Sequence, residues 1–252
     1  MRKSSFLLIA CIWLSALATS FLPCDAAPSP KYLSSGASEP HHNRHGGEHY
    51  WHKPCGIHLN DISIGARASK SEVRSSMMSV RIQFQLVFND FQKQNYDYLY
   101  DDASNDLKEK HYVPNWLPWN TSWIKDLTKA RFKGIADLMP MLHSDLQKFA
   151  MALEMVHGDE QRRKKVKDAL FSTKNYLKSL LCEVETSIAS MQAKIPDPIG
   201  REIMTSEDRK HLDETNRIVR DWGILLKYKN YLFAWEHVFE KPIQNYDDED
   251  DD

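Results

Sequence analysis

The chain has 252 residues, of which 42% are hydrophobic and 27% charged, and its formal net charge is −2. A balance so close to neutral excludes a nucleic-acid-binding protein that relies on bulk positive charge. The length suits one domain with one core. With nine glycines in the whole chain, a turn-rich all-β fold is disfavoured.

The first 26 residues have the pattern of a cleavable signal peptide. Arg2 and Lys3 precede an apolar run over residues 6–14, and small-residue cleavage sites end at Ala18 and Ala26. The apolar run is shorter than the ~20 residues that a membrane helix requires, and no later stretch reaches that length. The sequence therefore predicts a secreted, extracellular protein that does not insert into a membrane.

The cysteines favour the later of the two cleavage sites. Cleavage after Ala26 would remove the first two cysteines and leave Cys55 and Cys182 as an even pair in an oxidising compartment. Cleavage after Ala18 would leave an odd thiol. We therefore predict a signal peptide over residues 1–26 and a disulfide between Cys55 and Cys182.

Residues 27–66 are predicted to be a flexible, histidine-rich segment. Imidazole is the commonest metal ligand, so the histidines could bind zinc or copper, but their spacing matches no defined motif. We expect no specific metal site. The histidines of this segment are His41, His42, His45, His49, His52 and His58.

In the rest of the chain, apolar residues recur at intervals of three and four, which is typical of amphipathic helices. One such series predicts a helix over residues 69–99. A second runs over residues 123–156, where Pro140 either kinks the helix or divides it in two. After it, Gly158 suits a helix C-cap and Asp159 an N-cap, which predicts a tight turn.

Two further helices are expected. A third apolar series runs from Val166 to Met191 and ends before a link that contains two prolines. Residues 205–208 read Thr-Ser-Glu-Asp, a helix-start signal, and the aromatic series that follows extends to Phe239. Residues 242–252 are predicted to be a solvated acidic tail.

The lengths of the links predict the helix directions. The first link is long enough to cross a bundle, the second is a tight turn, and the third, at about ten residues, is marginal for a crossing. Two parallel helices followed by two antiparallel ones fit this pattern. Cys55 precedes the first helix and Cys182 lies late in the third, so they meet only if these helices run in opposite directions. We predict an all-α, up-up-down-down four-helix bundle over residues 67–241.

The sequence carries no recognisable catalytic motif. A nucleophile elbow, a phosphate-binding glycine loop and an HExxH motif are all missing, so we expect no enzyme activity, no cofactor and no small-molecule substrate. The basic run over residues 162–165 could be a prohormone cleavage site. Its predicted position in the first turns of a helix favours a solvated basic face instead.

Two aromatic groups are candidates for a partner surface. Trp116, Trp119 and Trp123 lie close together beside the glycosylation sequon at Asn120. The alternative is a small core that holds this link against the bundle. The last helix has more aromatic residues than one core face needs, so some should be exposed. They are Trp222, Tyr228, Tyr231, Phe233 and Trp235.

The leader, the four helical series and the loop pattern resemble the long-chain helical cytokines of the interleukin-6 and leptin class, and among them the insect Unpaired family. The resemblance covers residues 69–241. It implies a single-pass receptor similar to Domeless, signalling through JAK and STAT, and receptor contacts on the first and last helices and the first link. The corresponding residues here are Trp116, Trp119, Trp123, Arg209 and Trp222.

Two other functions remain open from the sequence. A secreted carrier would enclose an apolar ligand between its helices, with the aromatic residues lining a cavity. A venom, salivary or seminal effector with the same fold would have an unrelated target. The few cysteines count against carriers of the odorant-binding type, which use more disulfides.

Overall fold

We analysed a computed structural model of the chain. It describes residues 49–57, 59, 69–101, 113–118, 123–124, 127, 136–210 and 212–240. The predicted signal peptide, Trp119, Asn120 and the acidic tail lie outside these residues. The chain divides into units of residues 1–46 and 47–252, and every described residue belongs to the second.

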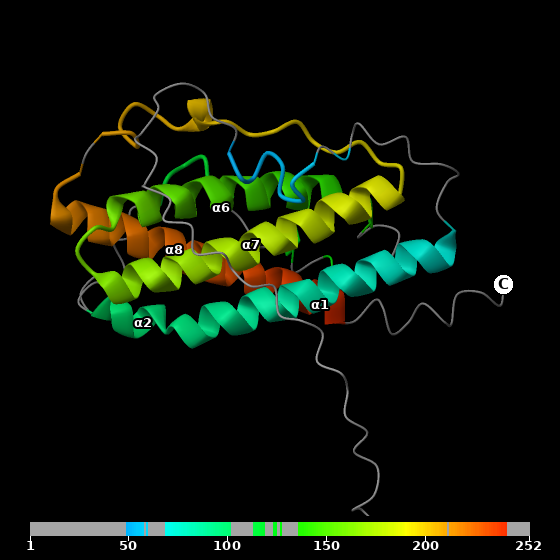
Figure 1. The fold of residues 1–252 in the computed structure, drawn as a ribbon, viewed down its shortest axis with the longest axis horizontal. Coiled ribbons are helices and arrows are strands. Elements are labelled where there is room, and N and C mark those ends of the chain that lie inside the picture. Colours follow the sequence, from blue (N-terminus) through cyan, green and yellow to red (C-terminus); the bar gives the residue numbers. More distant parts are fainter. Residues whose placement is uncertain are drawn as a thin grey trace, which may run out of the picture. The chain divides into compact units, whose positions relative to one another are not determined.

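The described residues contain helices and no strand, which confirms the all-α prediction (Figure 1). Four of the helices are longer than twenty residues. The elements are α1 (Lys70–Gln94), α2 (Tyr96–Leu99), α6 (Met139–Asp159), α7 (Lys164–Ser190), the short 3-10 helix η3 (Arg201–Ile203) and α8 (Glu214–Glu240).

Helix α1 begins with a capping box. The Ser69 hydroxyl accepts a hydrogen bond from the backbone N–H of Glu72, and the Glu72 carboxylate accepts one from the Ser69 N–H. At the other end Asn95 adopts a left-handed backbone with φ 50°, a conformation that asparagine tolerates better than most residues. The predicted helix over 69–99 is therefore present, with a break at Asn95 that separates α2.

Pro140 starts a helix and does not kink one. It lies in the first turn of α6, where a missing backbone N–H removes no intrahelical hydrogen bond. Of the two alternatives that the sequence left open, a kinked helix or two helices, the structure has a helix that begins at Met139.

The turn between α6 and α7 differs from the prediction, because Gly158 lies within α6 and Asp159 is its last residue. The Glu160 carboxylate, which is fully buried, accepts hydrogen bonds from the backbone N–H groups of Arg162 and Arg163 at 3.1 and 2.9 Å. These two bonds close the turn in place of the caps predicted at Gly158 and Asp159.

The start of the last helix was also predicted wrongly. Thr205 and Asp208 do make the reciprocal hydrogen bonds of a capping box, but these close only a turn. Helix α8 begins at Glu214, where the Asp213 carboxylate accepts a backbone N–H of the first turn. The link between α7 and α8 thus comprises residues 191–213, which is longer than predicted and removes the difficulty of a marginal crossing.

Helix α1 packs against both α7 and α8. Ser76 near the start of α1 bonds Ser187 near the end of α7 at 2.8 Å, whereas Asp90 further along α1 accepts a hydrogen bond from Ser172. The two helices therefore run antiparallel. The Phe84 ring centroid is 5.2 Å from that of Phe239 at the end of α8, whereas Phe91 further along α1 is 5.5 Å from Tyr228 near the middle of α8. Helices α1 and α8 are therefore antiparallel as well.

Helix α6 packs against the same two helices. It is antiparallel to α7 through the short turn between them. Asp145 in α6 accepts a hydrogen bond from Tyr231, and Asp159 at the end of α6 pairs with Arg220. The later residue of α6 contacts the earlier residue of α8, so these two helices are antiparallel too.

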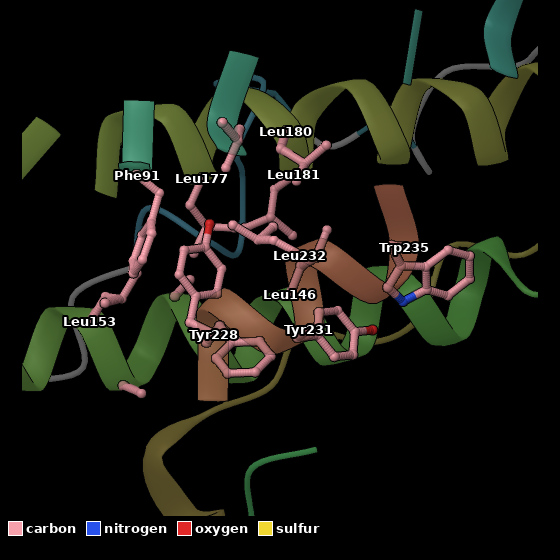
Figure 2. Packing of buried hydrophobic residues seen from close by; sticks show 14 of the residues in the cluster. Phe91, Leu146, Leu153, Leu177, Leu180, Leu181, Tyr228, Tyr231, Leu232 and Trp235 are labelled. Carbon is pink, nitrogen blue, oxygen red and sulfur yellow. The ribbon is translucent and has the colours of Figure 1, made fainter. Parts of the chain in front are cut away.

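Leucines of α6 and α7 and aromatic residues of α8 fill the core (Figure 2). Of the five aromatic residues on α8 that the sequence treated as too many for one core, four are buried and Phe233 is 47% exposed. Phe233 is thus the only one of the five that is exposed as expected. The other four are buried because α8 is covered on one side by α1 and on another by α6. Figure 2 labels Phe91, Leu146, Leu153, Leu177, Leu180, Leu181, Tyr228, Tyr231, Leu232 and Trp235.

Residues 49–57 form a strap across the bundle. Trp51 is 1% exposed and its indole N–H donates to the carbonyl of Ile199 at 2.8 Å, while the Tyr50 hydroxyl donates to the carbonyl of Ala150. This part of the segment that the sequence assigned to flexible chain is packed, because its aromatic side chains find apolar and polar partners on α6 and the α7–α8 link.

The predicted disulfide is confirmed. Cys55 of the strap is bonded to Cys182 of α7, with a sequence separation of 127 and a Cα–Cα distance of 4.8 Å. One turn further along α7, the Glu185 side chain is buried, and one of its carboxylate oxygens has no hydrogen-bond partner. Burial raises the pKa of Glu185 to about 7, although a backbone hydrogen bond from Leu59 acts against this shift.

Replacement of both Cys55 and Cys182 by alanine should lower the free energy of unfolding by about 2–4 kcal/mol, because the unfolded chain loses a long covalent loop. Urea unfolding followed by circular dichroism measures the change. An unchanged midpoint, or alkylation of both cysteines in the unreduced wild type, would contradict the disulfide.

The buried Glu185 should make stability depend on pH. Between its ordinary pKa near 4.5 and its folded pKa of about 7, the folded chain holds a proton that the unfolded chain has released. Stability therefore falls as pH rises through this range, by about 1–3 kcal/mol for this group. Unfolding measured at several pH values should show the fall in the wild type and its loss in Glu185→Gln. Glu183→Gln, which removes a half-buried carboxylate from the same helix, is the control. Equal pH profiles for the two variants would show that Glu185 does not cause the pH dependence.

Candidate functional site

Two of the predicted receptor-binding residues lie together where the two long links meet. The Trp116 indole N–H donates to the Asp208 carboxylate at 3.1 Å, and Trp116 is half-buried. Arg209 follows Asp208, is exposed, and donates from its Nε to the carbonyl of Thr205. The hydrogen bond between Trp116 and Asp208 connects the first link to the last. The Arg209 side chain remains exposed.

Trp123 occupies a different place. It is half-buried and meets Trp235 of α8 edge to face, with ring centroids 6.0 Å apart. This contact corresponds to the small core that the sequence offered as the alternative to a partner surface. Trp119 and the sequon at Asn120 lie outside the described residues.

Trp222 lies at a third place, near the start of α8, and is 6% exposed. Along the helix it is about 20 Å from Trp235 at 1.5 Å per residue. The described members of the predicted set are therefore spread over three positions and do not form one continuous patch.

Trp222 lines a pocket between the α1–α2 break and α8, with a volume of about 140 Å³. An engineered protein cavity of about this size holds one benzene ring. At its exposed side the Asp97 carboxylate pairs with the Lys229 ammonium at 3.3 Å. The lining residues are Phe91, Gln92, Asn95, Tyr96, Asp97, Trp222, Leu225, Leu226 and Lys229.

The exposed aromatic residue of α2 is next to this pocket in sequence. Tyr98 is 71% exposed, whereas Tyr96 and Tyr100 on either side of it are buried. The helix predicted over residues 69–99 includes Tyr96 and Tyr98 without a break before them. The signal that could have indicated the break is Asn95, because asparagine is enriched in left-handed backbone. We call Tyr98 together with the lining residues the α2–α8 pocket.

A buried ionic cluster lies next to the pocket. Glu160 binds Arg163 and Arg217, and the Asp221 carboxylate binds Arg220 at 2.7 Å. Burial disfavours the charged form of Glu160, but the hydrogen bonds from Arg163 and Arg217 outweigh it, so the pKa of Glu160 is lowered. Every charge in the cluster has a partner, which suits a structural lock between the α6–α7 turn and α8.

The remaining buried polar groups include the histidine His143. Burial lowers the pKa of His143 to about 4, so this histidine is neutral, and its Nδ1 contacts the Gln147 amide at 3.1 Å. No group of three histidines, cysteines or acids is placed to hold a metal ion in the part of the chain that the structure describes. Within that part, no helix is long and apolar enough to cross a membrane.

These features leave the α2–α8 pocket as the site with the best-defined geometry. It combines an apolar floor with a charged pair at its mouth, and the exposed Tyr98 follows one of the lining residues, Asp97, in the chain. The chain matches no protein-family model, no curated protein and no solved structure.

Proposed function

We propose that the chain is a secreted helical cytokine with up-up-down-down topology, which binds a single-pass, Domeless-like receptor and activates JAK and STAT. The observation that carries this proposal is the set of helix directions. Helices α1 and α6 are each antiparallel to both α7 and α8. Cytokine bundles have this order, with long crossing links between the parallel pairs.

The links support the same order. The α6–α7 turn is short, as a connection between antiparallel neighbours requires, whereas α7 and α8 are joined by residues 191–213. The residues between α2 and α6 also provide a long connection. Two connections that are long enough to cross a bundle, with a short turn between them, support this order over a simple up-down bundle.

We assign the receptor contact to the α2–α8 pocket, with Arg209 and Trp116 as a second contact. An apolar pocket of about 140 Å³ admits one aromatic or aliphatic side chain of a partner. This pocket does not favour a carrier of an apolar ligand, because small-molecule sites usually measure about 300–1,000 Å³. A lipid that co-purifies in a one-to-one ratio, detected by native mass spectrometry, would favour the carrier instead.

The purified protein should induce STAT phosphorylation in cells that carry a Domeless-like receptor, and not in the same cells without it. Receptor dimers respond to helical cytokines at low concentration, so a micromolar dose is ample. Absence of phosphorylation at that dose, from protein shown to be folded by circular dichroism, would refute the cytokine function.

Substitution of Tyr98 by alanine should weaken this response about tenfold or more while leaving the thermal midpoint unchanged, because exposed aromatic residues contribute little to stability and much to interfaces. Ile82→Ala, at a position 54% exposed on the outer side of α1, is the matched control and should leave the response intact. Equal responses from the two variants would exclude Tyr98 from the contact.

A further inference from the structure

A row of exposed lysines follows one side of α7. Lys164, Lys167 and Lys178 are exposed, and their spacing places them on the same side of the helix. None of these three forms an ion pair with a described residue, whereas Lys174 in the same row pairs with Glu154. The row begins beside Arg162, whose largely exposed guanidinium pairs with the Glu214 carboxylate of α8 at 2.9 Å.

The charge on this side of α7 is strongly one-sided. Over residues 164–178 the helix has five lysines and a single acidic residue, Asp168. The end of α6 contributes His157, and the positive charges of Lys174 and Lys167 add to burial in lowering the pKa of His157. The Glu154 carboxylate, which pairs with Lys174, acts against this shift.

An aromatic ring lies within the row. Phe171 is 58% exposed, and its ring centroid is 6.3 Å from that of His157. It comes one turn after Lys167 and two turns before Lys178. An exposed phenylalanine among unpaired lysines has no role in the core, because the buried side of α7 is formed by other residues.

We propose that this basic face binds a linear sulfated polysaccharide. The face consists of Lys164, Lys167, Phe171 and Lys178, which lie on one side of α7. From Lys164 to Lys178 it extends about 21 Å along the helix, which suits an extended polymer better than a single small anion. Sulfate groups accept hydrogen bonds from ammonium groups, and release of counterions from the polymer favours binding.

Phe171 favours a polysaccharide over other polyanions. The flat face of an aromatic ring can cover the C–H face of a sugar ring and bury apolar area, which an acidic peptide chain offers less well. The polymer would meet the protein outside the cell, so this inference rests on the proposed secretion. It does not depend on the receptor.

Heparin is the probe for this proposal. The triple variant Lys164→Gln, Lys167→Gln, Lys178→Gln should bind heparin about tenfold more weakly than the full wild-type chain near ~0.15 M ionic strength, since three ionic contacts are lost. The matched control Lys194→Gln, Arg201→Gln, Lys210→Gln removes the same charge from exposed positions of the α7–α8 link and should change binding less than about twofold. Glutamine suits these exposed positions, so folding should be unaffected.

A second variant separates sugar recognition from simple ion exchange. Phe171→Ala should lower the salt concentration that elutes the protein from immobilised heparin, but not from a sulfonate cation exchanger. Three results would overturn the proposal: no heparin binding by the wild type, equal losses in the two triple variants, or tighter binding to an acidic peptide or to anionic vesicles than to heparin. The assay contains no receptor, so it can succeed or fail independently of STAT phosphorylation.

Discussion

The four-helix arrangement depends on how the α7–α8 link is fastened at Ile199. A link that crosses the length of a bundle carries backbone N–H and C=O groups that need partners once they are partly buried. The Ile199 carbonyl accepts the Trp51 indole N–H, and the Ile199 N–H donates to the Gln147 side chain, both at 2.8 Å. The strap that supplies Trp51 is itself bonded to α7 by the Cys55–Cys182 disulfide. The strap, α6, α7 and the link are therefore held as one unit, and α8 begins from a fixed point.

Helix α8 completes the core from that point, and its middle and its start are stabilised by different chemistry. In the middle, Tyr228 and Tyr231 are buried between α1 and α6, and the Tyr231 hydroxyl is satisfied by Asp145. At the start, Arg220 and Asp221 are buried as an ion pair that also reaches the α6–α7 turn. Buried pairs of this kind contribute little net stability against an apolar replacement, but breaking one is costly. The cluster therefore fixes the position of the α2–α8 pocket, because Trp222 follows Asp221 directly.

The sequence predicted the helices well where a single periodic pattern decides the structure, and poorly where distant contacts decide it. The apolar series and the two remaining cysteines were sufficient for the all-α class and the disulfide. The helix-start signal at residues 205–208 was misleading, because Thr205 and Asp208 form the expected bonds without a helix after them. The strap was missed for a related reason, since Trp51 is ordered by Ile199 and no local pattern reveals such a partner. The predicted receptor residues followed from the resemblance to a cytokine family, which could not place Trp123 against Trp235 or Trp222 at a pocket.

The two proposed surfaces belong to different helices, and this separation has a functional consequence. The α2–α8 pocket uses α2 and the first half of α8, whereas the basic face uses the outer side of α7. The exposed groups of the two surfaces are different residues, since Tyr98 and Lys229 contribute to one and Phe171 and Lys178 to the other, although α2 contacts the first half of α7. A ligand whose receptor and polysaccharide contacts do not overlap can bind both at once. Binding to an extracellular polymer would then raise the local concentration of the protein near the receptor without blocking the receptor contact. This is the effective-concentration gain of two linked binding sites.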